Sequence, residues 1–167
     1  AKTISDFYPP IYELKRMLFK IYGNCPCFLL GHSFGGLVGA SFLINEQAEF
    51  RGMILSSPAV AIDPPPNAVM GVTIRLLSAL LPKFGVISID PDGVSRDPIV
   101  VNNYINDPLV HHGKVTAGLA FAIFSQMEQL AECASKLVLP TLIIHGGADR
   151  LASIQGAKSF FNSLRSA

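Results

Sequence analysis

The segment Phe28–Gly36, FLLGHSFGG, constrains the fold of this chain more than any other part of the sequence. The short apolar run Cys27–Leu30 is typical of a central strand in a parallel sheet, and the small-residue-rich stretch Gly35–Asn45 predicts a buried helix. Met53–Leu55 predicts the next strand. Because strand, helix and strand follow one another closely, we expect a βαβ unit with a right-handed crossover in an α/β fold.

Between the first strand and the helix, residues 31–35 match the pattern Gly-X-Ser-X-Gly. The pattern alone is weak evidence, since it arises by chance on the order of once in twenty chains of this length. Its position predicts a sharp turn that exposes the Ser33 hydroxyl as a nucleophile, with Gly31 and Gly35 small because strand and helix nearly touch. The Phe34 N–H, at the helix N-terminus, is expected to stabilise an oxyanion. The alternative is a turn formed only for packing.

Two other glycine-rich motifs do not fit this segment. A dinucleotide-binding fingerprint would need glycine where Ser33 stands. A phosphate-binding loop would need lysine and a hydroxyl residue where Leu37 and Val38 stand. The segment therefore does not predict nucleotide binding.

The sequence divides into three segments: a core over 1–58, an inserted helical cap over 59–139, and a return to the core over 140–167. The core segments predict a helix that follows Pro9 and Pro10 and ends at Gly23, a strand over 142–144 and an amphipathic helix over 154–164. The cap offers helical periodicity and no comparable strand. We expect its hinge at 63–66, helices over 69–81 and 114–136, and a loop over 85–97.

Asp149 follows the strand over 142–144, where a carboxylate could orient an imidazole in the chain order serine, acid, histidine. The alternative for Asp149 is a turn aspartate that caps the last helix. No histidine follows it. His32 is expected to pack or hydrogen-bond beneath the turn and His145 to pack, while His111 and His112 are expected in a solvated cap loop. Without a general base the serine is a weak nucleophile, so we expect the chain alone to be nearly inert and to be a fragment.

Composition excludes several classes of function. A net charge of +1, with 13 basic and 12 acidic residues scattered along the chain, gives no footprint for nucleic acid. Ile21–Asn45 lacks charged residues, but its polar residues and glycines favour a buried strand, turn and helix over a membrane span. Three cysteines and no secretory signal pattern predict reduced thiols, a cytoplasmic location and no zinc site.

The sequence of the serine turn closely resembles that of monoacylglycerol lipases, which are cap-bearing α/β-hydrolases. The resemblance continues through Gly52–Pro58, the cap signature Tyr104–Leu109 and the acid loop His145–Arg150. It implies a partial α/β-hydrolase fold with a helical cap and hydrolysis of monoacylglycerol or lysophospholipid esters without a metal or organic cofactor. It also implies that Ser33 is the nucleophile, Asp149 the triad acid and the Phe34 N–H one oxyanion donor.

The same resemblance places Tyr104 near the glycerol end of the substrate and Leu151 near the acyl channel. The family's histidine-glycine oxyanion loop and its catalytic histidine are absent from these 167 residues. The turn does not encode the leaving group, so another capped esterase or peptidase remains an alternative. A non-catalytic acyl-lipid-binding protein is a second alternative.

The cap contains more apolar residues than one buried helical face requires, which suits an acyl tunnel or peripheral membrane contact. Ordinary packing of the cap on the core is the alternative. The residues concerned are Met70, Val72, Ile74, Leu76, Leu77, Leu80 and Leu81, with Val115, Leu119, Phe121, Ile123, Phe124 and Met127.

Overall fold

The core of the protein is a three-stranded parallel sheet. The computed structural model describes residues 3–23 and 25–165. The strand order is β1 (Phe28–His32), β2 (Gly52–Ser56) and β5 (Thr141–Ile144), and all neighbours are parallel. The predicted parallel βαβ unit is confirmed. Because the strands are parallel, the residues that follow β1, β2 and β5 meet at one edge of the sheet.

The helix α2 (Phe34–Glu46) packs tightly against this sheet, and its residues from Gly36 to Leu43 are buried. Glycine permits the close approach: a Cβ on Gly36 would lie 2.8 Å from the Pro58 Cβ, and one on Gly39 would lie 2.5 Å from the Leu29 side chain. Complete burial explains why α2 carries no charge over most of its length. None of the helices formed by the described residues is both long and apolar enough to cross a bilayer.

Two further helices complete the core. A 3-10 turn, η1 (Ile4–Phe7), leads into α1 (Tyr8–Tyr22), which ends at Gly23 with a φ of 67°. The Tyr8 and Tyr12 rings pack edge-on against Phe42 of α2, at centroid distances of 5.4 and 5.1 Å. The helix α6 (Ile154–Ser163) follows β5, and η2 (Gln47–Glu49) precedes β2. The predicted core helices are therefore confirmed.

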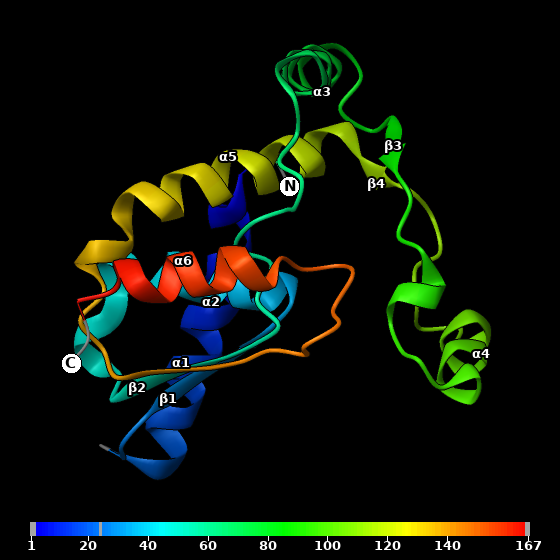
Figure 1. The fold of residues 1–167 in the computed structure, drawn as a ribbon. Helices are drawn as coiled ribbons and strands as arrows, with labels where there is room; N and C mark the ends of the chain where they lie inside the picture. Colours follow the sequence, from blue (N-terminus) through cyan, green and yellow to red (C-terminus); the bar gives the residue numbers. More distant parts are fainter. Residues whose placement is uncertain (1–2, 24, 166–167) are drawn as a thin grey trace.

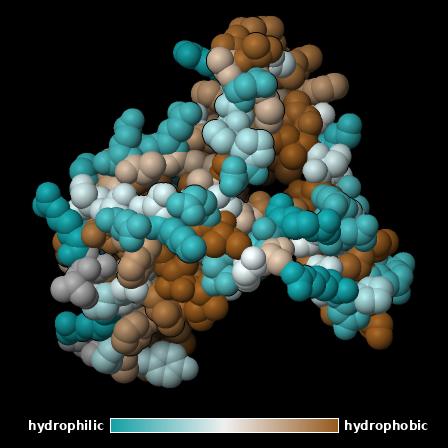
Figure 2. All heavy atoms as spheres, in the orientation of Figure 1, coloured by the Kyte–Doolittle hydropathy of each residue, from teal (hydrophilic) through white to brown (hydrophobic). Residues whose placement is uncertain are grey.

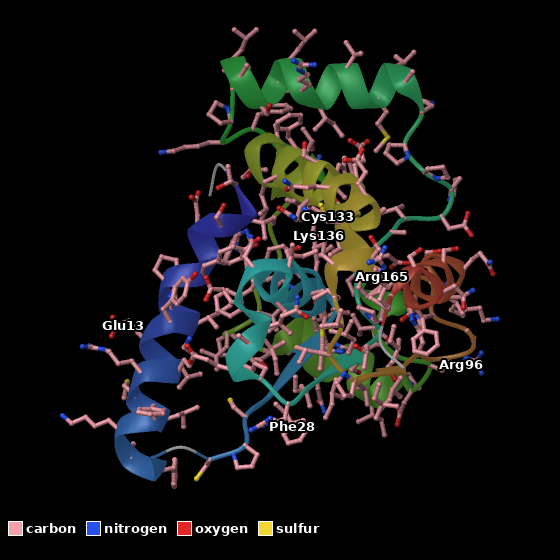
Figure 3. All side chains as sticks on the ribbon, turned by 90° about the vertical axis from the view of Figure 1, so that its left-hand side faces the viewer. Glu13, Phe28, Arg96, Cys133, Lys136 and Arg165 are labelled. Atoms are coloured by element: carbon pink, nitrogen blue, oxygen red, sulfur yellow. The ribbon has the colours of Figure 1, made fainter. Side chains whose placement is uncertain are left out.

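The cap contains three helices and a small antiparallel sheet. These are α3 (Ala68–Leu80), β3 (Gly85–Ile87), η3 (Pro91–Gly93), α4 (Pro98–Asn106), β4 (Val115–Thr116), α5 (Ala117–Cys133) and η4 (Ala134–Lys136). Figure 1 shows α3 lying across α5, away from the sheet, and α4 projecting at the far side of the cap. The same stacking of α3 on α5 is visible from the side in Figure 3.

Three expectations for the cap were wrong. The cap does contain strands, because β3 pairs with β4, and residues 85–97 are therefore not a plain loop. The long helix expected from Lys114 starts at Ala117, since residues 115–116 belong to β4 and the Thr116 side chain caps α5. Strands of two and three residues are too short to leave an alternating pattern, which explains why the sequence did not reveal them.

One face of the core sheet is exposed over the described residues. Phe28, Leu30, Leu142 and Ile144 point to this face and are between 54% and 68% exposed, whereas Met53 on the opposite face is 1% exposed. Phe28, the first residue of β1, is labelled in Figure 3. Figure 2 shows apolar atoms gathered both here and over α3. The alternation of side chains along each strand thus gives the sheet two apolar faces, of which only one is covered.

Candidate active site

Ser33 occupies a strained turn between β1 and α2. Its φ of 51° and ψ of −119° lie in a region that residues other than glycine rarely adopt. Hydrogen bonds hold this backbone in place: the Ser33 N–H donates to the Ser56 carbonyl at 3.0 Å, and its carbonyl accepts from the N–H groups of Gly36 and Ala59, both at 2.9 Å. A turn fixed from both sides can keep its central side chain in one direction.

The flanking glycines have different roles. A Cβ on Gly31 would lie 2.6 Å from the Gly35 carbonyl oxygen and 2.8 Å from the Gly36 Cα, so strand and helix do nearly touch there. A Cβ on Gly35 would meet nothing within 4 Å. The expectation that Gly35 must be small for the same reason is wrong.

Phe34 is the first residue of α2, where backbone N–H groups have no acceptor within the helix. Its ring turns toward the core and meets the Phe7 ring edge-on at a centroid distance of 5.1 Å. The side chain thus anchors the start of the helix, and the Phe34 N–H is at the helix end where the macrodipole favours negative charge.

Asp149 lies in the loop between β5 and α6, and its carboxylate is held by several donors. Oδ1 accepts hydrogen bonds from the backbone N–H groups of Leu151 and Ala152, at 2.8 and 3.0 Å. Burial by itself would raise the pKa of Asp149. The hydrogen bonds from Ala152, Leu151 and the Ser57 side chain, with the field of His145, outweigh burial and hold that pKa below its ordinary value.

Of the two histidines nearest the site, His145 differs from expectation, whereas His32 makes a hydrogen-bonding contact of the kind expected. His145 contacts the triad candidate instead of merely packing: its Nε2 lies 3.4 Å from Asp149 Oδ2 and 3.3 Å from the Ala152 carbonyl oxygen. His32 is exposed, and its Nδ1 lies within hydrogen-bond distance of the Ser56 carbonyl and hydroxyl oxygens, at 3.0 and 3.2 Å. His111 and His112 are exposed in the cap, as expected.

A cavity of about 1520 Å³ joins these groups to the cap. Ser33, Ser57 and Asp149 line it from the core, so the structure brings the predicted serine and acid to one cavity. Arg96, labelled in Figure 3, lines it from the cap. His145 is not among the lining residues, which places it behind the Asp149 carboxylate rather than facing the cavity.

The two predicted substrate-binding residues also line this cavity. Tyr104 lies on α4, with its ring edge-on to His112 at a centroid distance of 5.8 Å. Leu151 is 46% exposed and packs against Gly93 of the cap. Among the residues that the structure describes, no cluster of three or more histidine, cysteine or acidic side chains could hold a metal ion.

Sequence reasoning missed Ser57, which combines two unusual properties. Its φ is 41°, and it follows β2 at the same edge of the sheet as Ser33 and Asp149. Its N–H donates to the Ile144 carbonyl at 2.7 Å, and its side chain hydrogen-bonds to the Asp149 carboxylate. The run Ser56-Ser57-Pro58 at the end of a strand beside the serine turn was the available signal.

We expect Ser57→Ala to raise the pKa of Asp149, because the carboxylate loses one of the hydrogen bonds that favour its charged form. The pKa of Asp149 is lower in the folded chain, so its ionisation stabilises the fold above the unfolded pKa, and this contribution is lost as the pH falls through the folded pKa. In the variant this contribution should be smaller, and its loss should be complete at a higher pH. NMR titration of the Asp149 carboxyl carbon measures the shift.

Ser57→Gly is the matched control, because it also removes the hydroxyl but relieves the positive φ. Both variants should raise the pKa of Asp149. A rise in the alanine variant alone would assign the effect to the backbone and contradict the role of the hydroxyl.

The parallel sheet, with a serine on a strained turn after one strand and a carboxylate after another, defines the class of this protein as an α/β-hydrolase. A family model described as serine aminopeptidase, S33, and named Hydrolase_4 matches residues 2–167. The chain belongs to this family.

Similar proteins are named as lipases. The chain is 33% identical to the monoacylglycerol lipase of Mycolicibacterium smegmatis over 165 residues, which are 99% of this chain and 59% of that protein. It is 32% identical to the monoglyceride lipase of Rattus norvegicus, over 93% of this chain and 52% of the relative. The crystal structure of Paleococcus ferrophilus monoacylglycerol lipase superposes with a TM-score of 0.85 at 28% identity, covering 98% of this chain and 62% of that one. The chain thus spans between half and two thirds of the length of these relatives.

Proposed function

We propose that the protein is a serine hydrolase that cleaves monoacylglycerol or lysophospholipid esters to a fatty acid and an alcohol. The observation that carries the proposal is the shared cavity, into which the strained turn presents Ser33 and the acid loop presents Asp149. The names of its relatives support a lipid ester as substrate.

In this mechanism the Ser33 Oγ attacks the acyl carbonyl carbon, and an imidazole takes the hydroxyl proton and later gives it to the leaving alkoxide. The carbonyl oxygen becomes an oxyanion stabilised by the Phe34 N–H. Water then attacks the acyl carbon while the imidazole takes its proton, and the imidazole returns that proton to Ser33 Oγ as the acyl–Oγ bond breaks and the fatty acid leaves. Asp149 orients the imidazole through its carboxylate, which the backbone N–H groups of Leu151 and Ala152 hold in place through Oδ1.

The imidazole and a second oxyanion donor come, in this proposal, from residues outside 1–167, and the chain alone is nearly inactive. His145 does not line the cavity. His32 does, but it precedes Ser33, whereas the chain order of this fold class places the catalytic histidine after the acid, and no histidine follows Asp149 in these 167 residues. The exposed apolar face formed by Phe28, Leu30, Leu142 and Ile144 supports the same proposal, since a face of this kind needs a cover in a stable α/β fold.

The cavity also suggests how the substrate lies. Tyr104 offers a hydroxyl from the cap wall and would contact the glycerol end. Leu151 offers an apolar side chain beside Asp149 and would contact the start of the acyl chain. No cofactor takes part in this mechanism.

The proposed location is cytoplasmic, with contact to the membrane surface through α3. Val69, Leu76 and Leu80 of this helix are 76%, 57% and 77% exposed, and α3 lies at the outer side of the cap in Figure 1. Exposed apolar helices bind the interface between lipid head groups and acyl chains.

We expect Leu76→Asp with Leu80→Asp to reduce co-sedimentation with phosphatidylcholine vesicles. Ser78→Asp on the same helix serves as the charge control. Equal sedimentation of both variants would contradict membrane contact.

A panel of acyl esters and amides, assayed with the full-length protein, tests the activity. We expect hydrolysis of monoacylglycerol or lysophospholipid and little cleavage of amides. A preference for aminoacyl amides would instead favour the peptidase alternative that the family description suggests. Binding of monoacylglycerol without turnover would favour a non-catalytic lipid-binding protein.

A further inference from the structure

The loop that carries Asp149 also holds the cap. The Arg150 guanidinium donates a hydrogen bond to the backbone carbonyl of Asp92 in η3. Next to it, Leu151 packs so closely on the cap that a Cβ on Gly93 would lie 2.7 Å from the Leu151 Cδ2. In Figure 1 the loop between β5 and α6 extends from the core toward this part of the cap, and both segments line the cavity.

The same region contacts the other end of the insertion. The Ser153 N–H donates to the carbonyl of Ala61, where the chain leaves the core for the cap, at 3.4 Å. Gly156 on the first turn of α6 leaves no room for a Cβ beside the Ala61 side chain. Residues 150–156 therefore contact both the entrance of the cap and its η3 segment.

Arg150 belongs to a loop that both positions the Asp149 carboxylate and contacts the cap. The residue before it is Asp149, and the residue after it, Leu151, donates its backbone N–H to the Asp149 carboxylate. The contact of Arg150 itself goes to a backbone carbonyl in the cap, so its guanidinium does not compete for the carboxylate. A charged donor on a neutral acceptor is stronger than a neutral pair.

We infer that Arg150 is a positioning residue, which fixes residues 90–96 of the cap to the acid loop and thereby sets the shape of the substrate cavity. Its effect is on the cap wall that contacts substrate, and the hydrogen bonds that orient Asp149 remain without it. We call the attachment of residues 90–96 to the acid loop through Arg150 the clamp. The part of this inference that concerns substrate rests on the proposed function, whereas the clamp itself does not.

Hydrogen exchange measured by mass spectrometry on the purified protein tests the clamp without an activity assay. We expect Arg150→Met to speed amide exchange in residues 89–97 by about tenfold, as the loss of one hydrogen bond to a charged group would do. Arg150→Lys should restore part of the protection, since an ammonium can donate to the same carbonyl. Asp92→Asn should keep it, because the acceptor belongs to the backbone.

Arg75→Met, at an exposed arginine of α3, controls for loss of a cap cation, and circular dichroism establishes that each variant folds. Unchanged exchange over residues 89–97 in Arg150→Met would overturn the inference, as would equal exchange in the lysine and methionine variants. If all assayed esters prove inert, the exchange result still decides the clamp, so the two failures are distinguishable.

Steady-state kinetics of the full-length protein add a second readout. We expect Arg150→Met to raise KM about tenfold with kcat retained, because the cavity wall loosens while the triad acid keeps its donors. A fall in kcat with KM unchanged would place Arg150 in the chemistry of the triad and overturn its assignment to the cap.

Discussion

Replacing Ser33 with alanine is expected to lower kcat for ester hydrolysis by about 10⁶-fold in the full-length protein, the effect of removing a serine nucleophile. Alanine lacks the Oγ that attacks the carbonyl, and no other lining residue presents a hydroxyl from the same strained turn. KM should change little. Steady-state turnover of a monoacylglycerol measures kcat and KM. Labelling by a fluorophosphonate probe is the second measurement, and it should disappear in the variant.

Ser163→Ala is the matched control, since Ser163 is an exposed serine at the end of α6 whose hydroxyl donates only to a carbonyl of its own helix at 2.9 Å. Labelling and turnover should both survive there. If the probe fails to modify Ser33 in a full-length protein that contains a histidine after Asp149, the serine hydrolase proposal is wrong.

The second large effect is expected from Asp149→Asn, which should reduce kcat by about 10⁴-fold, as an amide cannot hold the imidazole in the required tautomer. The amide oxygen can still accept the hydrogen bonds from Leu151 and Ala152, so the loop should keep its conformation. Turnover of the same ester, with thermal unfolding as the check on the fold, measures this effect.

Asp107→Asn provides a close control. Asp107 Oδ1 accepts from the Leu109 N–H at 2.8 Å, the same local geometry that Asp149 has with Leu151, but Asp107 does not line the cavity. Activity near that of the unmodified protein is expected for Asp107→Asn. An equal loss in both variants would indicate that loop structure, rather than the carboxylate, limits the rate.

Much of the core could be predicted because local sequence and final structure agree there. The apolar runs of β1, β2 and β5, the Pro9-Pro10 start of α1 and the glycine at its end each have one favourable local structure. The cap was predicted less well. Its β3–β4 pair joins residues about thirty positions apart, and neither strand has a pattern of its own.

The candidate site also contains both residues that local sequence indicated and residues that it did not. Ser33 and Asp149 could be found by their positions after strands, and Phe34 by its position at a helix start. Ser57 could not, because its importance depends on the parallel register that brings the end of β2 beside the Asp149 carboxylate. His145 is only four residues from Asp149, but nothing in the sequence indicated that the loop would bring its ring to the carboxylate. The contact of Arg150 with the cap joins residues far apart in sequence, so no local motif could indicate it.

The sequence by itself determined the parallel core and the sharp serine turn, and it indicated Asp149 as the candidate acid, because hydrophobic periodicity, glycine spacing and position after a strand act over a few residues. Only the tertiary structure decided that Ser33 and Asp149 line one cavity, that Ser57 lies beside the Asp149 carboxylate, and that Arg150 contacts the cap. Those relations depend on hydrogen bonds and packing between distant segments, which form only when the whole chain has folded.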